Sequence, residues 1–191
     1  MDAPFRFGIK FFAEESAPVE LDELIPVFHR LIQEQALPDV LIDVADYSHV
    51  YAGPGTLLIA HEGNYGYDET GNRRGLIYYS KRSTGGSLPD LLERICRNAL
   101  QACRHIEQAA ELKNRITFPC GELMVFSNDR LAVPNTEESY EQFLPDLRVL
   151  LDKLYAGAEY EINRETDPRE RLTLFVKASA LVGADTLLSR L

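Results

Sequence analysis

The sequence predicts an α+β protein in which helices pack on one face of a mainly antiparallel sheet. Short stretches rich in β-branched and aromatic residues alternate with longer stretches whose apolar residues recur every three to four positions. The order strand–helix–strand–strand occurs near each end of the chain, with one long helix between. Because the chain has 191 residues, 45% of them apolar, it is predicted to form a single domain over residues 1–191.

The first part of the chain supplies four of the predicted strands and one helix. The helix begins near Ile25 and ends before Pro38, with apolar residues on one face. Pro26 falls in its first turn, where the missing N–H costs nothing. The strands are predicted over residues 5–12, 40–47, 55–62 and 74–81.

The middle of the chain contains a capping box, Ser87 with Asp90, followed by an apolar helical stripe. This pattern predicts a central helix over about residues 88–113, roughly 40 Å long at 1.5 Å per residue. A helix of that length could cross the sheet or reach a second subunit, so a homodimer is expected. A Gly/Ser linker over 83–87 precedes the helix.

The last part predicts a strand region, a helix, two strands and a short C-terminal helix or arm. The strand region is interrupted at Pro119, and the helix begins at Asn135-Thr136 and ends at Gly157. The corresponding ranges are 116–129 for the strand region, 158–165 and 171–178 for the two strands, and 179–191 for the tail.

The two ends of the chain also align with each other. LIPVFHRLI, residues 24–32, matches FLPDLRVLL, residues 143–151, and the prolines Pro26 and Pro145 coincide. The alignment predicts pseudo-repeat halves over about residues 5–82 and 116–178. This element order resembles the duplicated strand-helix-strand-strand domains of the gyrase-inhibitor-like family. The resemblance implies a small-molecule ligand in a groove between the halves, although fold alone does not fix function.

A second resemblance is local. The strings DVADYSHV, GPG, HEGNY and NDRLAVPNT resemble an uncharacterised group of bacterial cytoplasmic proteins. The resemblance implies a bacterial, cytoplasmic protein and brings no assigned activity and no catalytic residues.

Composition narrows the classes of partner. The net charge of −10 repels phosphate backbones, so nucleic acid is not expected as a partner. No secretory signal is recognisable, and no apolar run approaches the ~20 residues needed to span a membrane. Cys96, Cys103 and Cys120 have no short pair spacing and are predicted to be buried and reduced, as in the cytoplasm.

The stretch from Asp43 to Tyr65 is the strongest candidate for a site. With a turn centred on Pro54 between Gly53 and Gly55, opposite residues have numbers that sum to about 108. This register places Tyr47 opposite His61 and Asp43 opposite Tyr65. Because opposite residues share a face, one face carries Asp43, Tyr47, His49, His61 and Tyr65, and the other carries Ile42, Val44, Leu58 and Ala60, with Asp46 opposite Glu62.

The same register has consequences for the chemistry. His61 and Glu62 are adjacent in a strand, so the predicted pleat points them to opposite faces and they cannot act as a dyad. An imidazole beside phenols and a carboxylate could serve as an acid–base centre. His49, His61 and Asp43 could instead hold a divalent metal. A shift of one in the register would place His61 beside Asp46 and Ser48.

Tyrosine and histidine are also common on half-buried sheet faces without any chemistry. The sequence contains no established catalytic motif, and it predicts no cofactor. The primary prediction is therefore a non-catalytic small-molecule-binding or interaction protein. The alternatives are an acid–base or metal-assisted enzyme centred on the 43–65 face, and a structural subunit of an assembly.

Overall fold

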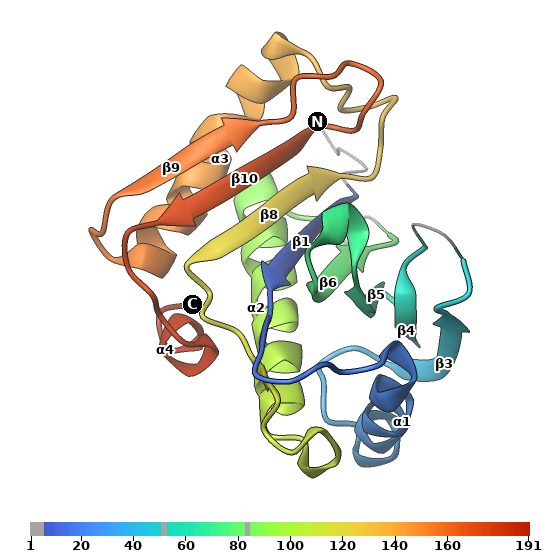
Figure 1. Cartoon of the computed structure of the whole chain (residues 1–191). Helices are drawn as coiled ribbons and strands as arrows, with labels where there is room; N and C mark the ends of the chain where they lie inside the picture. Colours follow the sequence, from blue (N-terminus) through green and yellow to red (C-terminus); the bar gives the residue numbers. More distant parts are fainter. Residues whose placement is uncertain (1–5, 51–52, 83–84) are drawn as a thin grey trace.

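The main sheet of the protein has eight strands, and every neighbouring pair is antiparallel. The computed structural model describes residues 6–50, 53–82 and 85–191, with the strands in the order β3-β4-β5-β6-β1-β8-β10-β9 (Figure 1). The predicted α+β class and mainly antiparallel sheet are confirmed. Phe5 of the first predicted strand and residues 83–84 of the predicted linker lie outside the described residues.

The strands of the main sheet are short and mostly match the predicted stretches. In chain order they are β1 (Phe7–Phe12), β3 (Leu41–Tyr47), β4 (Gly55–Ala60), β5 (Gly63–Asp68), β6 (Gly75–Ser80), β8 (Glu122–Ser127), β9 (Tyr160–Arg164) and β10 (Thr173–Ala178). A separate two-stranded sheet pairs β2 (Glu14–Glu15) with β7 (Ile116–Thr117). The strand β5 was not predicted as a separate element.

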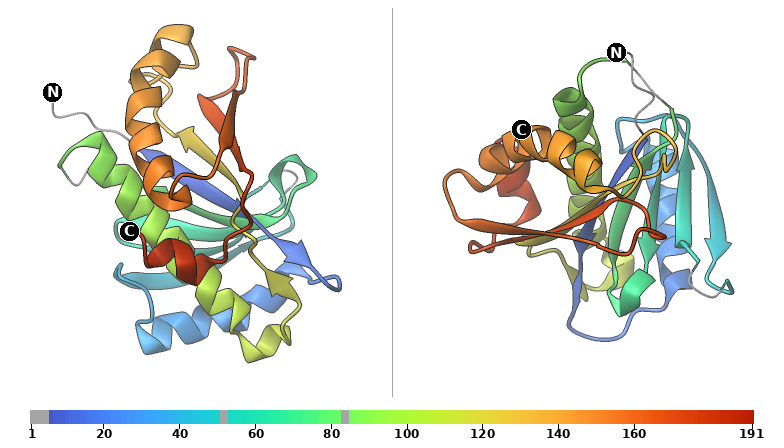
Figure 2. Two further views of the ribbon diagram at one scale, coloured as in Figure 1. Left: turned by 90° about the vertical axis from the view of Figure 1, so that its left-hand side faces the viewer. Right: turned by 90° about the horizontal axis from the view of Figure 1, so that it is seen from above.

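The helices lie on one face of the twisted sheet (Figure 2). They are α1 (Leu24–Glu34), α2 (Leu88–Glu107), α3 (Glu137–Tyr155) and α4 (Ala184–Leu188), with the 3-10 turns η1 (Leu21–Glu23), η2 (Thr70–Asn72) and η3 (Ala110–Leu112). The helix α1 packs against β3 and β4, α2 crosses β1 and β6, and α3 and α4 flank α2. Among the described residues, none of the helices has both the length and the apolar character that crossing a bilayer requires.

The helix boundaries follow local signals. Pro26 lies in the first turn of α1, and Ser87 and Asp90 form the predicted capping box of α2. Thr136 caps α3, as predicted. The predicted end of α2 near residue 113 is wrong: α2 ends at Glu107 and is about 30 Å long. The 3-10 turn η3 follows α2. The chain then reverses toward β7 at Lys113 and Asn114, which both adopt left-handed conformations.

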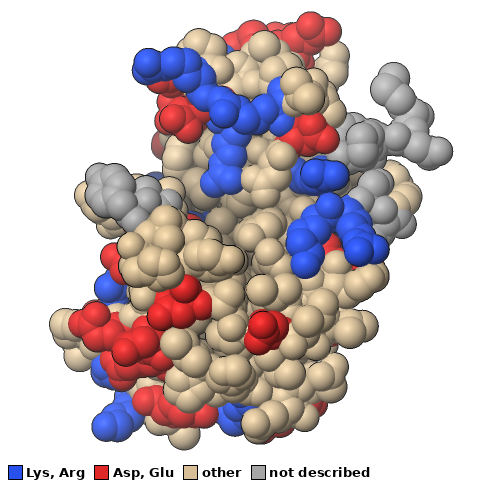
Figure 3. Space-filling view, turned by 90° about the vertical axis from the view of Figure 1, so that its right-hand side faces the viewer, with Lys and Arg blue, Asp and Glu red and all other residues tan. Residues whose placement is uncertain are grey.

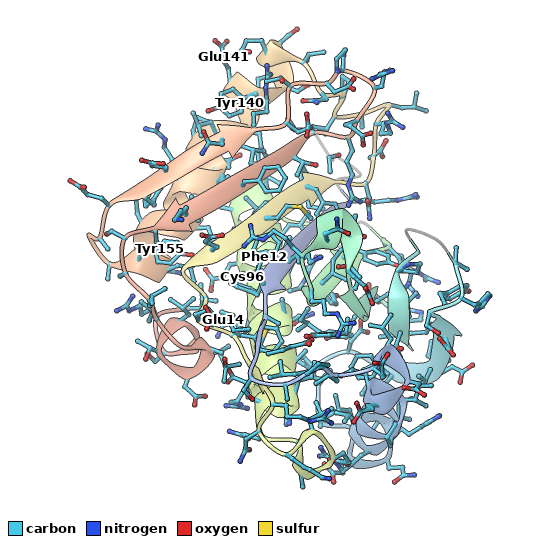
Figure 4. The ribbon with its side chains drawn as sticks, in the orientation of Figure 1. Phe12, Glu14, Cys96, Tyr140, Glu141 and Tyr155 are labelled. Atoms are coloured by element: carbon cyan, nitrogen blue, oxygen red, sulfur yellow. The ribbon has the colours of Figure 1, made fainter. Side chains whose placement is uncertain are left out.

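Two apolar clusters lie on opposite faces of the sheet. The larger one is the core beneath the helices, to which β1 contributes Phe7, Ile9 and Phe11. The smaller one, on the open face, consists of Phe12, Ile77, Met124 and Phe126. Figure 4 labels Phe12 of the smaller cluster on β1, and Cys96 on α2 and Tyr155 on α3 of the larger one.

The smaller cluster is covered by arginine side chains instead of a helix. The guanidinium of Arg73 lies 3.6 Å from the centre of the Phe12 ring, and that of Arg171 lies 3.7 Å from the centre of the Phe126 ring. Gly8 leaves room for the Phe126 ring, because a Cβ at this position would lie 2.2 Å from its Cζ atom. These contacts explain how Phe12 and Phe126 are buried on a face that has no helix.

The two halves of the chain share the order strand–helix–strand–strand, and only the first half continues beyond it. The second half has the order β8–α3–β9–β10, whereas the first half continues after β1–α1–β3–β4 with the extra strands β5 and β6. In the sheet, β6 pairs with β1, and β10 pairs with β8. The pseudo-repeat stays a prediction, with an extra hairpin in its first half.

The three cysteines are buried and free, as predicted. Burial raises the pKa of the Cys96 and Cys103 thiols, so both remain protonated.

Candidate functional site

The predicted hairpin register is wrong. Residues of β3 and β4 pair with numbers that sum to 102, so Asp43 faces Ile59 and Tyr47 faces Gly55. The connection between these strands is therefore a longer loop that begins at Ser48, and it is not a tight turn centred on Pro54. The predicted pairing of Asp46 with Glu62 is also wrong, because Asp46 faces Thr56.

The chain reverses a second time after Ala60, and Asp39 fixes where it does so. Its carboxylate, 8% exposed, accepts the amides of Val40 at 2.8 Å, Glu62 at 3.0 Å and Gly63 at 3.0 Å. This buried acceptor holds the turn between β4 and β5. The predicted second arm of the hairpin is therefore two antiparallel strands.

The five candidate residues are dispersed by this arrangement. Tyr65 lies on β5 opposite Leu58 and Tyr78, on the helix-covered face, with no exposed surface. Burial raises its pKa, so its phenol stays protonated. Asp43 and Tyr47 belong to the open face of the edge strand β3, and His49 lies in the exposed turn that follows it. The predicted shared face is thus wrong.

His61 and Glu62 were predicted to point apart, and the structure contradicts this. They occupy the turn after β4, where Nδ1 of His61 lies 2.7 Å from Oε1 of Glu62. The two side chains are 47% and 41% exposed. Within residues 6–50, 53–82 and 85–191, no group of three or more His, Cys, Asp and Glu side chains has the arrangement of a metal site, including His49, His61 and Asp43.

A cleft does lie beside the stretch, at the loop between β3 and β4. This loop cleft has a volume of about 470 Å³ and is lined by Leu21, Tyr47, Ser48, Val50, Gly53, Gly55, Glu69, Thr70, Gly71 and Asn72. A neighbouring hollow of about 380 Å³ shares Leu21, Ser48 and Glu69 with it and adds Glu20, Asp22 and Asp46. The two hollows together present four carboxylates.

The wall of the loop cleft formed by residues 69–72 is held from below by a buried ion pair. Lys10 of β1 forms a hydrogen-bonded ion pair with Asp68, and their side chains are 1% and 5% exposed. The Lys10 ammonium also donates to the carbonyl oxygen of Arg73 at 2.7 Å. Asp68 in turn accepts the Thr70 hydroxyl at 2.8 Å. A charge that is buried in this way needs all of these partners, so it fixes the turn.

The opposite wall is anchored in the same manner. Thr56 of β4 is fully buried, and its hydroxyl donates to the carbonyl oxygen of Leu21 at 2.6 Å. Arg74 contacts the carboxylates of Glu15 and Glu69, and Tyr67 donates to Glu15 at 2.7 Å. These bonds connect η1 and η2 to the sheet, so the walls of the loop cleft are positioned before anything binds.

Gly55 closes the inner end of the loop cleft. Its φ of +68° lies in the left-handed region, and an added Cβ would lie 2.2 Å from the carbonyl oxygen of Tyr67. Gly55 therefore permits the close approach of β4 to β5 that ends the loop.

The chemistry offered by the loop cleft and the neighbouring hollow is that of hydrogen-bond acceptors. Hydrogen bonds from the hydroxyl and amide of Ser48 hold the pKa of Asp46 below its usual value, so Asp46 is ionised near neutral pH. Glu69 is 46% exposed and shares its charge with Arg74 at 3.3 Å. Figure 3 shows acidic side chains gathered in the lower part of this side of the molecule. Such a surface favours cations and groups rich in N–H donors.

Comparison of the chain with protein-family models, with curated proteins and with solved structures finds no match. The functional conclusion therefore depends on the geometry described above.

Proposed function

We propose that the protein is a non-catalytic binding protein whose loop cleft recognises a cationic group. The observation that supports this proposal is that the walls of the loop cleft are anchored by buried contacts and that carboxylate groups lie beside them. Lys10–Asp68 and Thr56 anchor the walls. Glu69 lines the loop cleft, and Asp46 lines the neighbouring hollow that shares Glu69 with it. A cleft that needs no rearrangement loses less free energy on binding.

An enzyme is the less supported alternative. It would have to use the His61–Glu62 contact, which is exposed and lies outside the lining of the loop cleft. The other predicted candidates, Asp43, His49 and Tyr65, do not lie together with the His61–Glu62 pair at one site. No described observation favours the structural-subunit alternative.

The proposal is tested with a small cationic probe. Nα-acetylarginine amide should shift the NMR resonances of Tyr47, Ser48 and Asn72, and its neutral isostere Nα-acetylcitrulline amide should not. The substitution Glu69→Gln removes one negative charge and should weaken the binding of the cation several-fold. A higher salt concentration should also weaken the binding of the cation, because the carboxylate of Glu69 and the bound cation are both exposed to solvent.

The matched control is Glu141→Gln. Glu141 is exposed on α3, at the far end of the molecule from the loop cleft (Figure 4). This substitution removes the same charge and should leave the titration unchanged. Equal shifts by the arginine and citrulline probes would contradict the proposal, and so would equal weakening by the two substitutions.

A further inference from the structure

The strand β3 forms one edge of the sheet (Figure 1), and exposed apolar side chains lie on it and just beyond both of its ends. Eight large apolar side chains are exposed among the described residues, and four of them lie within residues 40–50. These are Val40 at 64%, Ile42 at 55%, Val50 at 43% and Tyr47 at 40%. An edge strand also presents N–H and C=O groups that no neighbouring strand pairs. Together these features describe a surface suited to another extended chain.

A β-bulge places one of these side chains. Leu41 pairs with Ala60 and Asp43 pairs with Ile59, so Ile42 is an extra residue without a partner on β4. Bulges bend an edge strand and redirect a side chain. The bulge shifts the alternation of side chains, so Leu41 and Val44 both contact the core beneath the helices, while Ile42 between them is exposed.

One backbone amide on β3 and one just after it donate to neighbouring carboxylates. The amide of Val44 donates to Asp43, and the amide of Ser48 donates to Asp46, both at 2.8 Å. These short side chains can rotate away when another acceptor arrives. These two amides thus have acceptors in the free protein without a neighbouring strand.

The other edge of the sheet, β9, differs in this respect. Its tyrosine Tyr160 donates to Asp152 of α3 at 2.6 Å, and Arg164 contacts Glu137 of the same helix at 2.7 Å. Its outward positions include the charged Glu161, and no exposed large apolar residue lies on it. Of the two edge strands of the main sheet, β3 thus carries exposed large apolar side chains and β9 carries none.

The negative charge around β3 indicates which kind of chain could pair with this strand. Asp43 and Asp46 lie on the strand, and the loop cleft with Glu69 lies at its C-terminal end. A second copy of this chain, which also carries a net charge of −10, would bring a second set of these carboxylates to the same edge. A segment that alternates basic and apolar residues would instead complement both the charge and the exposed side chains.

We infer that β3 is the docking strand for an extended basic segment of a partner protein, which adds to the sheet and delivers a cationic side chain to the loop cleft. This inference rests on the proposed function and adds to it the class of partner and the mode of binding. Strand addition supplies affinity through main-chain hydrogen bonds, and the cleft supplies the preference for a cation.

The test uses a short capped peptide of alternating lysine and valine. On binding, it should slow the hydrogen exchange of β3 amides as well as shift resonances of the loop cleft. The same peptide N-methylated at every second residue keeps its charges and side chains but cannot pair, and it should bind about tenfold more weakly. Ile42→Lys should weaken binding of the unmethylated peptide by a similar factor, about tenfold, through lost contact and added repulsion.

The control for Ile42→Lys is Val149→Lys. Val149 is 58% exposed on α3, close to the 55% of Ile42, and it lies far from β3. This control should bind the peptide within about twofold of the unsubstituted protein. Both substitutions are at exposed positions, so thermal unfolding of both should match that of the parent chain.

The possible failures are distinguishable. If the methylated and unmethylated peptides bind equally and shift only the loop cleft, strand addition is overturned while the cation site stands. If neither peptide nor the arginine probe binds, both proposals fail. If sedimentation shows a dimer that Ile42→Lys dissociates, the occupant of β3 is a second copy, and the inference of a basic partner is overturned.

Discussion

Two ion pairs, one within the main sheet and one in a turn between its strands, differ in almost every physical respect. Lys10 and Asp68 meet on neighbouring parts of the open face, with side chains 1% and 5% exposed, and carbonyl and hydroxyl groups complete their coordination. His61 and Glu62 are adjacent in sequence, lie in a turn and are 47% and 41% exposed. The first pair holds the wall of a cleft, whereas the second is a contact between adjacent, half-exposed side chains in a turn. The difference shows that burial, more than residue type, decides which charges organise a site.

The largest expected effect comes from breaking the buried pair. Asp68→Leu leaves the Lys10 ammonium buried without a counter-charge, and Lys10→Met does the same to Asp68. Each should lower the free energy of unfolding by about 3–5 kcal/mol, measured by denaturant titration. The double variant Lys10→Met/Asp68→Leu should lose less than the sum of the two single losses, because it leaves no unpaired charge. Additive losses would show that the two groups act independently.

A smaller effect is expected at the opposite wall of the loop cleft. Thr56→Val keeps the shape of the buried side chain but removes the hydroxyl that the carbonyl oxygen of Leu21 accepts. The free energy of unfolding should fall by about 1–2 kcal/mol, since a buried acceptor loses its partner. Thr56→Ser retains the hydroxyl and serves as the matched variant. The valine variant should also bind the arginine probe more weakly, and unchanged binding would show that η1 is positioned by other contacts.

The smallest effect is expected at the exposed pair. His61→Ala and Glu62→Ala should each change the free energy of unfolding by less than about 0.5 kcal/mol, as for most surface ion pairs. Binding of the arginine probe should be unchanged, because neither residue lines the loop cleft. A double-mutant cycle measures the coupling directly. A coupling comparable to that of Lys10 and Asp68 would invalidate the distinction between the two pairs.

Much of the fold could be predicted from local patterns, and the register could not. The helices α1, α2 and α3 begin where Pro26, Ser87 and Thr136 indicate. The strand β5, GNYGYD, contains two glycines, which lower strand propensity and made it look like the arm of one hairpin. Its separation from β4 depends on Asp39, a residue outside both strands, so no local pattern contains the information.

Part of the candidate site could likewise be predicted from the sequence, and part could not. The stretch beside the loop cleft was recognised, and Tyr47 does line it. Lys10 was overlooked because alternation along β1 makes it look like an ordinary outward-facing polar residue. The one available signal was its position among aromatic residues in FGIKFF. Its partner Asp68 and the acceptor Glu69 lie in a turn cluster typical of solvent-exposed loops, so their importance becomes evident only when β1, β5 and β6 are brought together.

The pairing of β1 with β8 has a consequence for the order of assembly. Phe7 meets Ser127 across this pair, whereas the strands β3 to β6 are joined to one another by short connections. As the chain leaves the ribosome, β1 can pair with β6 on one side long before β8 exists. During that interval its other side is an unprotected edge next to Phe11 and Phe12. The strand β1, which lies in the middle of the finished sheet, is thus an edge strand until β8 has been synthesised. We expect aggregation or chaperone binding during that stage of synthesis.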